Sequence, residues 1–131
     1  MLIELGKGNE KVARKIIELS GTDVDACYQC GDCSAGCPSA FEMEVLPNQI
    51  NALLTYGDSD SVLKSNTIWL CVACYECGTR CPHGIDFAKV AEAARQVVLR
   101  ANKDRIELWR QSELEILPAV AIVSAGRKFT S

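Results

Sequence analysis

Two cysteine-rich stretches decide the fold of this chain: Cys27-Tyr28-Gln29-Cys30-Gly31-Asp32-Cys33-Ser34-Ala35-Gly36-Cys37-Pro38 and Cys71-Val72-Ala73-Cys74-Tyr75-Glu76-Cys77-Gly78-Thr79-Arg80-Cys81-Pro82. Both have the form Cys-x2-Cys-x2-Cys-x3-Cys-Pro, and each cysteine of the second run follows its counterpart in the first by 44 residues. Together they contain all 8 cysteines of the chain. A single repeat of this kind indicates a site with approximate twofold symmetry rather than a solenoid, which needs more repeats.

The spacing within each run indicates ligands for iron–sulfur clusters. A [4Fe–4S] cluster takes four thiolates, and three cysteines at this spacing can wrap one corner of the cluster from a single loop. The proline after the fourth cysteine turns the chain away from that loop, and in bacterial ferredoxins with this run the fourth cysteine binds the other cluster. The predicted ligands are therefore crossed between the runs, with Cys27, Cys30, Cys33 and Cys81 for one cluster and Cys71, Cys74, Cys77 and Cys37 for the other.

Two other uses of the cysteines fit the pattern less well. Zinc ribbons use two cysteines per knuckle, and zinc does not need the third equally spaced cysteine of each run. Disulfides are rare in the cytoplasm, and residues 1–7 contain no long apolar stretch that could serve as a signal peptide.

No apolar run approaches the ~20 residues needed to cross a bilayer, so we expect a cytoplasmic protein without a transmembrane segment.

Length and charge narrow the classes of function. A chain of 131 residues suits a single domain, and a net charge of −3 gives no basic excess for binding nucleic acid. A core this small needs additional stabilisation. Each crossed cluster is bound by cysteines of both runs, so we expect the chain to fold only when its clusters are bound. Fully ligated clusters leave no open iron site for a substrate. The sequence therefore predicts an electron carrier with no catalytic residues of its own.

The rest of the chain shows helical patterns, and the predicted fold is all-α with two cysteine-rich ligand loops. No stretch alternates with the two-residue period of a half-buried strand, except weakly near the C-terminus. The expected helices are one between Asn9 and Gly21, one over about 47–56, one from near Asp60, and one after the N-cap Asp86 that extends to about Trp109.

Several side chains near the runs have both a structural and a functional interpretation. Trp69 is expected in the core because apolar residues flank it, and packing is preferred over cluster shielding for Tyr28 and Tyr75. His83 is expected to face solvent in a turn rather than to tune a cluster. The tail, residues 113–131, carries an apolar patch with two interpretations, packing back on the domain or docking on another subunit, and docking is preferred.

The long helical spacer between the runs resembles the alpha-helical ferredoxin fold rather than a simple two-cluster ferredoxin. Within that group, residues 27–38 and 69–82 are most similar to the two motifs of the iron–sulfur C subunit of heterodisulfide reductase, as is the acidic-then-hydrophobic start after Pro82. The resemblance covers about residues 22–112, within an expected single domain of residues 1–131. The chain lacks the Cys-x4-Cys-x2-Cys run of the [2Fe–2S] domain that succinate dehydrogenase subunits add.

This resemblance implies a hetero-oligomer in which the chain relays electrons through two [4Fe–4S] clusters. The implied partners are the A subunit, which contains flavin and iron–sulfur clusters, and the catalytic B subunit, which reduces a disulfide through clusters bound at Cys-Cys-Gly motifs. This chain has no Cys-Cys pair, so it is not expected to reduce a disulfide itself. The alternatives are a free-standing ferredoxin-like carrier, the iron–sulfur subunit of another flavin-dependent dehydrogenase, and an iron–sulfur sensor or structural protein.

Overall fold

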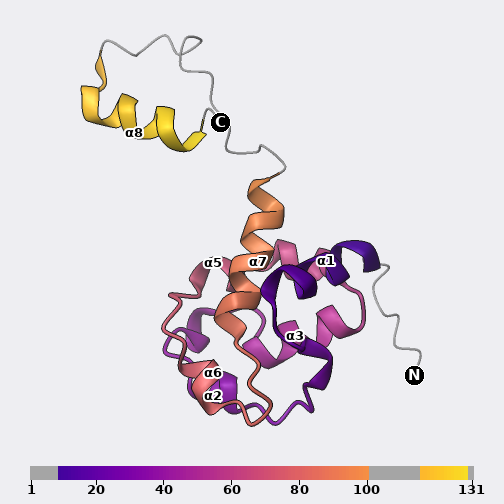
Figure 1. Cartoon of the computed structure of the whole chain (residues 1–131). Helices are drawn as coiled ribbons and strands as arrows, with labels where there is room; N and C mark the ends of the chain where they lie inside the picture. Colours follow the sequence, from indigo (N-terminus) through magenta and orange to yellow (C-terminus); the bar gives the residue numbers. More distant parts are fainter. Residues whose placement is uncertain (1–8, 101–115, 130–131) are drawn as a thin grey trace. The chain divides into compact units, whose positions relative to one another are not determined.

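A computed structural model describes residues 9–100 and 116–129 of the chain (Figure 1). The chain divides into two compact units, residues 1–98 and residues 99–131. All regular structure in the described ranges is helical, which confirms the predicted all-α fold. The helices are α1 (Glu10–Ser20), α2 (Asp32–Ala35), α3 (Pro47–Thr55), α4 (Ser59–Lys64), α5 (Thr67–Leu70), α6 (Glu76–Arg80), α7 (Phe87–Leu99) and α8 (Ala119–Phe129), with 3-10 turns at Val24–Ala26 and Ala40–Glu42.

The ends of the longer helices follow local signals in the sequence. Gly21 adopts the left-handed conformation that ends α1, with φ of 64°. Pro47 occupies the first turn of α3, where its missing N–H costs nothing. The carboxylate of Asp86 accepts the N–H of Ala88 at 3.0 Å and caps α7 as predicted. The predicted extension of this helix to Trp109 falls in residues 101–115, outside the described residues.

The helix predicted from near Asp60 begins at Ser59, one residue earlier. Asp58 caps this helix, α4, because its carboxylate accepts the backbone N–H of Ser61 at 3.1 Å and the hydroxyl of Ser61 at 2.7 Å. These hydrogen bonds hold the pKa of Asp58 below its usual value.

The core of the first unit is aliphatic, with one aromatic residue, Phe87. Helix α7 carries a buried stripe and is the long orange helix in Figure 1. This stripe and buried residues of α1, α3, α4 and α5 form one hydrophobic cluster. Fully buried members include Ile16, Ile50, Leu54, Val62, Ile68 and Val90.

The expectation that Trp69 lies in the core is wrong, because 50% of its surface is exposed. Helix α5 is a single turn, and its buried residues are Thr67 and Ile68. Successive residues of a helix point about 100° apart, so the residue after Ile68 turns toward solvent.

The second unit contains α8, which begins directly after Pro118. The carbonyl of Pro118 accepts the N–H groups of Ala121 and Ile122 at 2.9 and 3.2 Å. Val120 and Val123 on this helix are exposed, in the region of the predicted apolar patch. None of the helices in the described ranges is long and apolar enough to span a bilayer. The predicted core boundary at residue 112 and the docking role of the tail stay predictions.

Candidate metal centres

The eight cysteines line two cavities in the first unit. Each cavity takes three cysteines from one run and the fourth from the other run. The first cavity is lined by Cys27, Cys30, Cys33 and Cys81. The second cavity is lined by Cys71, Cys74, Cys77 and Cys37. This is the grouping that crossed ligation requires, and all eight are free cysteines in the structure. Ligation by these particular residues stays a prediction.

The arrangement of the sulfurs suits clusters better than single metal ions. A zinc ion would draw four sulfurs to ~2.3 Å from one point. Within the described parts of the chain, no group of three His, Cys, Asp or Glu side chains converges on a point as ligands of one ion would. In a [4Fe–4S] cluster each iron takes its own thiolate, so four separated sulfurs around a cavity are what the group needs. The residues therefore fit two clusters of the same kind.

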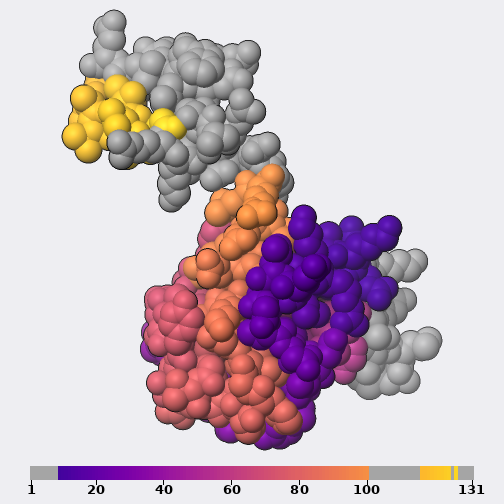
Figure 2. All heavy atoms as spheres, in the orientation of Figure 1, coloured from indigo at the N-terminus to yellow at the C-terminus, as the bar shows by residue number. Residues whose placement is uncertain are grey.

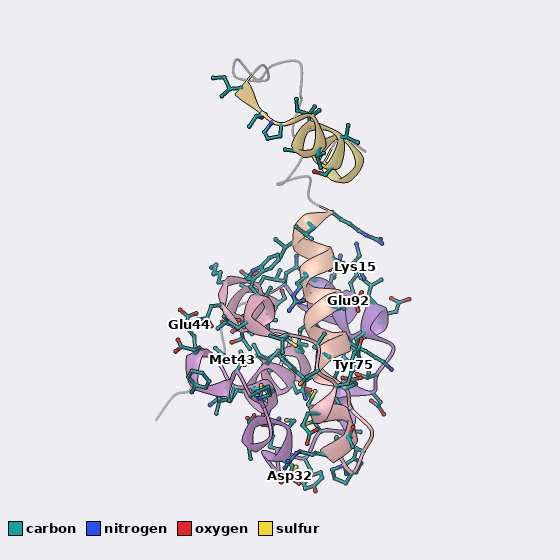
Figure 3. All side chains as sticks on the ribbon, turned by 90° about the vertical axis from the view of Figure 1, so that its left-hand side faces the viewer. Lys15, Asp32, Met43, Glu44, Tyr75 and Glu92 are labelled. Atoms are coloured by element: carbon teal, nitrogen blue, oxygen red, sulfur yellow. The ribbon has the colours of Figure 1, made fainter. Side chains whose placement is uncertain are left out.

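The backbones of the two cysteine loops repeat the same unusual conformations. Gln29 and Ala73, at equivalent positions of the runs, have φ of 63° and 53°. The next equivalent pair, Gly31 and Tyr75, has φ of 85° and 61°. A left-handed conformation costs a residue with a Cβ roughly 1–2 kcal/mol, so the tight loop shape is maintained against local preference. Figure 3 labels Tyr75, which precedes α6, and Asp32, the first residue of α2.

The short helices of the two loops, α2 and α6, pack against each other (Figure 1). In this region Gly36 lies against Arg80, and these residues directly precede Cys37 and Cys81. A Cβ on Gly36 would clash with the side chain of Arg80, which also forms an ion pair with Glu76 at 2.8 Å. This contact lies next to the fourth cysteine of each run. Cys37 of the first run lines the second cavity, and Cys81 of the second run lines the first cavity.

We expect Gly36→Ala to destabilise the loaded protein through Arg80 alone. The exposed Arg80 side chain can swing aside at the loss of its pair with Glu76, so the cost should be about 1 kcal/mol or less. Anoxic thermal unfolding should show a midpoint lower by a few degrees, and Gly36→Ala should have no further effect in an Arg80→Ala background. An equal loss in both backgrounds would contradict the proposed contact.

Burial governs the chemistry of the inner thiols. Desolvation raises the pKa of Cys33, Cys71 and Cys77, because the thiolate form loses its water. Backbone N–H groups oppose this at each site and lower the pKa, including those of Phe87 and Ala88 at Cys77. Iron must therefore displace protons from these thiols, after which N–H groups are already in place to stabilise the thiolates.

A charged side chain of α7 reaches the start of the second loop. Arg95 donates hydrogen bonds to the carbonyl oxygens of Ile68 and Cys71. Its positive charge lowers the pKa of Cys71, although desolvation by burial remains the larger effect on this thiol. Arg95 therefore fixes the end of α5 relative to α7 and places a positive charge near the second cavity.

The tyrosines of the runs lie at the cavities rather than in the core. Tyr28 is 60% exposed and lines the first cavity, and Tyr75 is 48% exposed and lines the second. Both side chains stay largely outside the core, and the preference for packing over cluster shielding stays a prediction. His83 is exposed in a turn, as predicted, and its ring meets that of Tyr28 edge to face with centroids 5.0 Å apart. Figure 2 shows the segment around residues 70–85, in salmon, on the surface of the first unit.

Three amide side chains of the first cavity were not predicted from the sequence: Gln29, Asn48 and Asn51. One signal was available, because Asn51 interrupts the apolar face of α3 between Ile50 and Leu54. A buried amide in such a stripe needs a partner, and that partner lies in the first cavity.

Proteins of known family resemble this chain. A family model for the 4Fe-4S dicluster domain matches residues 23–85. The chain is 39% identical over 77 residues to the iron-sulfur C subunit of the CoB–CoM heterodisulfide reductase of Methanopyrus kandleri, covering 59% of this chain and 40% of the relative. It is 34% identical to the C2 subunit of the H2/formate:CoB-CoM heterodisulfide,ferredoxin reductase of Methanococcus maripaludis, covering 94% and 65%. The match to the C subunit of the H2:CoB-CoM heterodisulfide,ferredoxin reductase of Methanothermobacter marburgensis is 30%, covering 77% and 55%.

The chain spans about half the length of these curated relatives. The matched dicluster domain, residues 23–85, contains both cysteine runs, and this match together with the eight cysteines shows that two [4Fe–4S] clusters are the cofactors.

Proposed function

The chain belongs to the family of heterodisulfide reductase iron–sulfur C subunits, and on this premise we propose that it relays electrons between two other subunits of a disulfide-reducing complex. The proposed partners are an A subunit with flavin and iron–sulfur clusters and a catalytic B subunit with Cys-Cys-Gly motifs. Members of this family are electron-transfer subunits of hetero-oligomers. We further propose that this complex works in the cytoplasm.

The observation that carries the proposal is the composition of the two cavities. Each offers four cysteines, one for each iron of a cluster, so no iron is left open for a substrate. When bound, the clusters accept and release single electrons. The residues of the chain then hold the clusters, exclude water at the buried Cys77, and bring the two loops into contact at Gly36 and Arg80. Such a site transfers electrons without converting a molecule.

The acceptor proposed for the complex is a disulfide. The names of the relatives specify the heterodisulfide of CoB and CoM, and for this chain we propose a disulfide of that class. Because the chain has no Cys-Cys pair, it depends on a different protein of the complex for that step.

An anoxic, low-salt pull-down of the native protein tests the proposal. We expect mass spectrometry to identify a flavoprotein and a protein with Cys-Cys-Gly motifs. In the recovered complex, a disulfide should reoxidise the reduced clusters, whereas the purified chain should stay reduced with the same disulfide. A chain recovered alone, fully loaded with iron, would instead indicate a free-standing carrier. Reoxidation of the isolated chain by the disulfide would contradict its non-catalytic role.

A further inference from the structure

Two side-chain amides approach one sulfur of the first cavity. Gln29 donates from Nε2 to Sγ of Cys27 at 3.2 Å, and Asn51 approaches the same sulfur with Nδ2 at 4.0 Å. The two amides come from separate parts of the structure, because Gln29 lies in the first cysteine loop and Asn51 lies on α3. Cys27 is thus approached by donors from both its own loop and the neighbouring helix.

A hydrogen-bond network fixes the orientation of the first amide. Asn48 donates from Nδ2 to Oε1 of Gln29 at 3.2 Å, which leaves the N–H groups of Gln29 to face the sulfur. Asn48 is held in turn by Ser34, whose hydroxyl donates to Oδ1 of Asn48 at 2.6 Å and accepts its backbone N–H at 3.1 Å. The network therefore extends from α2 through α3 to Cys27.

The orientation of the second amide, that of Asn51, leaves a buried oxygen unpaired and so lowers the stability of the fold. Asn51 is 2% exposed, and its Oδ1 is a buried atom without a hydrogen-bond partner in the described part of the chain. An unpaired buried oxygen carries a desolvation penalty that an apolar residue of similar size would avoid. Turning the amide over would place Oδ1 against a thiolate, where the two negative atoms repel. The observed orientation is therefore explained by the sulfur rather than by the packing of α3.

The second cavity has no matching pair. Its lining includes Pro47, Val72 and Phe87, and no side-chain amide. The side chain that meets its inner sulfur is the carboxylate of Asp86, with Oδ1 at 3.7 Å from Sγ of Cys77. Backbone N–H groups serve sulfurs of both cavities. Side-chain amide donors thus distinguish the first cavity from the second.

We propose that Gln29 and Asn51 raise the reduction potential of the cluster in the first cavity through N–H groups directed at Sγ of Cys27. The inference rests on the proposed ligation of that cluster by Cys27. Reduction adds negative charge that the thiolate sulfurs share, so N–H donors stabilise the reduced state more than the oxidised state. The amide pair therefore favours residence of the electron at the first cavity.

Anoxic redox titration of the isolated loaded chain, followed by electron paramagnetic resonance, tests this role. In Asn51→Leu, one of the two midpoints should fall, so that the ratio of reduced to oxidised cluster at the wild-type midpoint drops about threefold. Asn51→Asp replaces the donor by a charged acceptor and should lower the ratio about tenfold or more. Gln29→Leu should move the same midpoint as Asn51→Leu. The midpoint of the other cluster should stay unchanged in all three variants.

Gln49→Glu is the matched control for the added charge. Gln49 lies on α3 near Asn51, but its Oε1 accepts the N–H of Leu46, and Glu keeps that acceptor. Unchanged midpoints in fully loaded Asn51→Leu and Gln29→Leu would overturn the inference, as would equal shifts of both midpoints. If Asn51→Leu does not load, the exposed Gln29 decides the question alone. A wild-type chain with fewer than about eight irons would contradict the proposed function instead, and iron analysis before titration reveals this.

Discussion

A Cys81→Ala chain will lose the cluster of the first cavity, although Cys81 belongs to the second run. In the structure Cys81 lines the cavity of Cys27, Cys30 and Cys33, next to which α2 and α6 bring the two runs into contact. Removing one thiolate leaves an iron without its protein ligand, and a cluster held by three thiolates is lost or degraded. The iron content should fall from about eight toward about four per chain.

The pairing of variants makes this result specific. Cys30→Ala should remove the same electron paramagnetic resonance signal and the same midpoint as Cys81→Ala. Cys37→Ala and Cys74→Ala should remove the other signal, because both residues line the second cavity. Crossed ligation is wrong if Cys81→Ala and Cys74→Ala abolish the same signal. All four variants need anoxic purification, so that oxidation does not damage both clusters together.

The crossed grouping could be anticipated because it depends on spacing alone. A loop that carries three ligands has no reach for a fourth that lies beyond a proline, so the fourth cysteine is free to serve the neighbouring loop. The starts of α3 and α7 were also predictable, because each depends on a residue in its own first turn or next to it. Pro47 occupies the first turn of α3, and Asp86 accepts a backbone N–H at the start of α7.

The features that the sequence did not reveal depend on contacts between distant segments. Helices α2 and α6 have 4 and 5 residues, and nothing in their own sequences stabilises a helix this short. The orientation of Trp69 follows from which face of α5 meets the core. The amide of Asn51 gains its meaning only when Cys27, 24 residues earlier in the chain, lies beside it. Periodicity reports which residues are buried, but not what a buried polar group meets.

Removal of the clusters should abolish the cooperative unfolding of the first unit. The two loops are 44 residues apart in sequence, and each cavity joins them. By analogy with a disulfide, closing a loop of this length stabilises the folded state by about 4 kcal/mol through the entropy of the unfolded chain. That is a large part of the ~5–15 kcal/mol that stabilises a typical domain.

Local strain adds to this dependence. Gln29, Ala73 and Tyr75 have left-handed backbones, and each costs roughly 1–2 kcal/mol that cluster binding must offset. Burial raises the pKa of Cys33, Cys71 and Cys77, so these thiols are protonated in the cluster-free chain near neutral pH. The direct contact of α2 with α6 then remains. The exposed pair of Arg80 with Glu76 lies within α6 and adds little to the stability of the folded chain.

Circular dichroism of chelator-treated and untreated protein, both kept anoxic, measures the effect. We expect the untreated protein to unfold in one sharp transition, whereas the cluster-free chain should retain part of its helical signal and lose it gradually on heating. The retained signal would come from α1, α3 and α7, whose apolar faces can still associate. Reconstitution with iron and sulfide should restore the sharp transition in the wild type. A cluster-free chain with a transition as sharp, and a midpoint as high, as the loaded form would show that the helical core folds without its clusters.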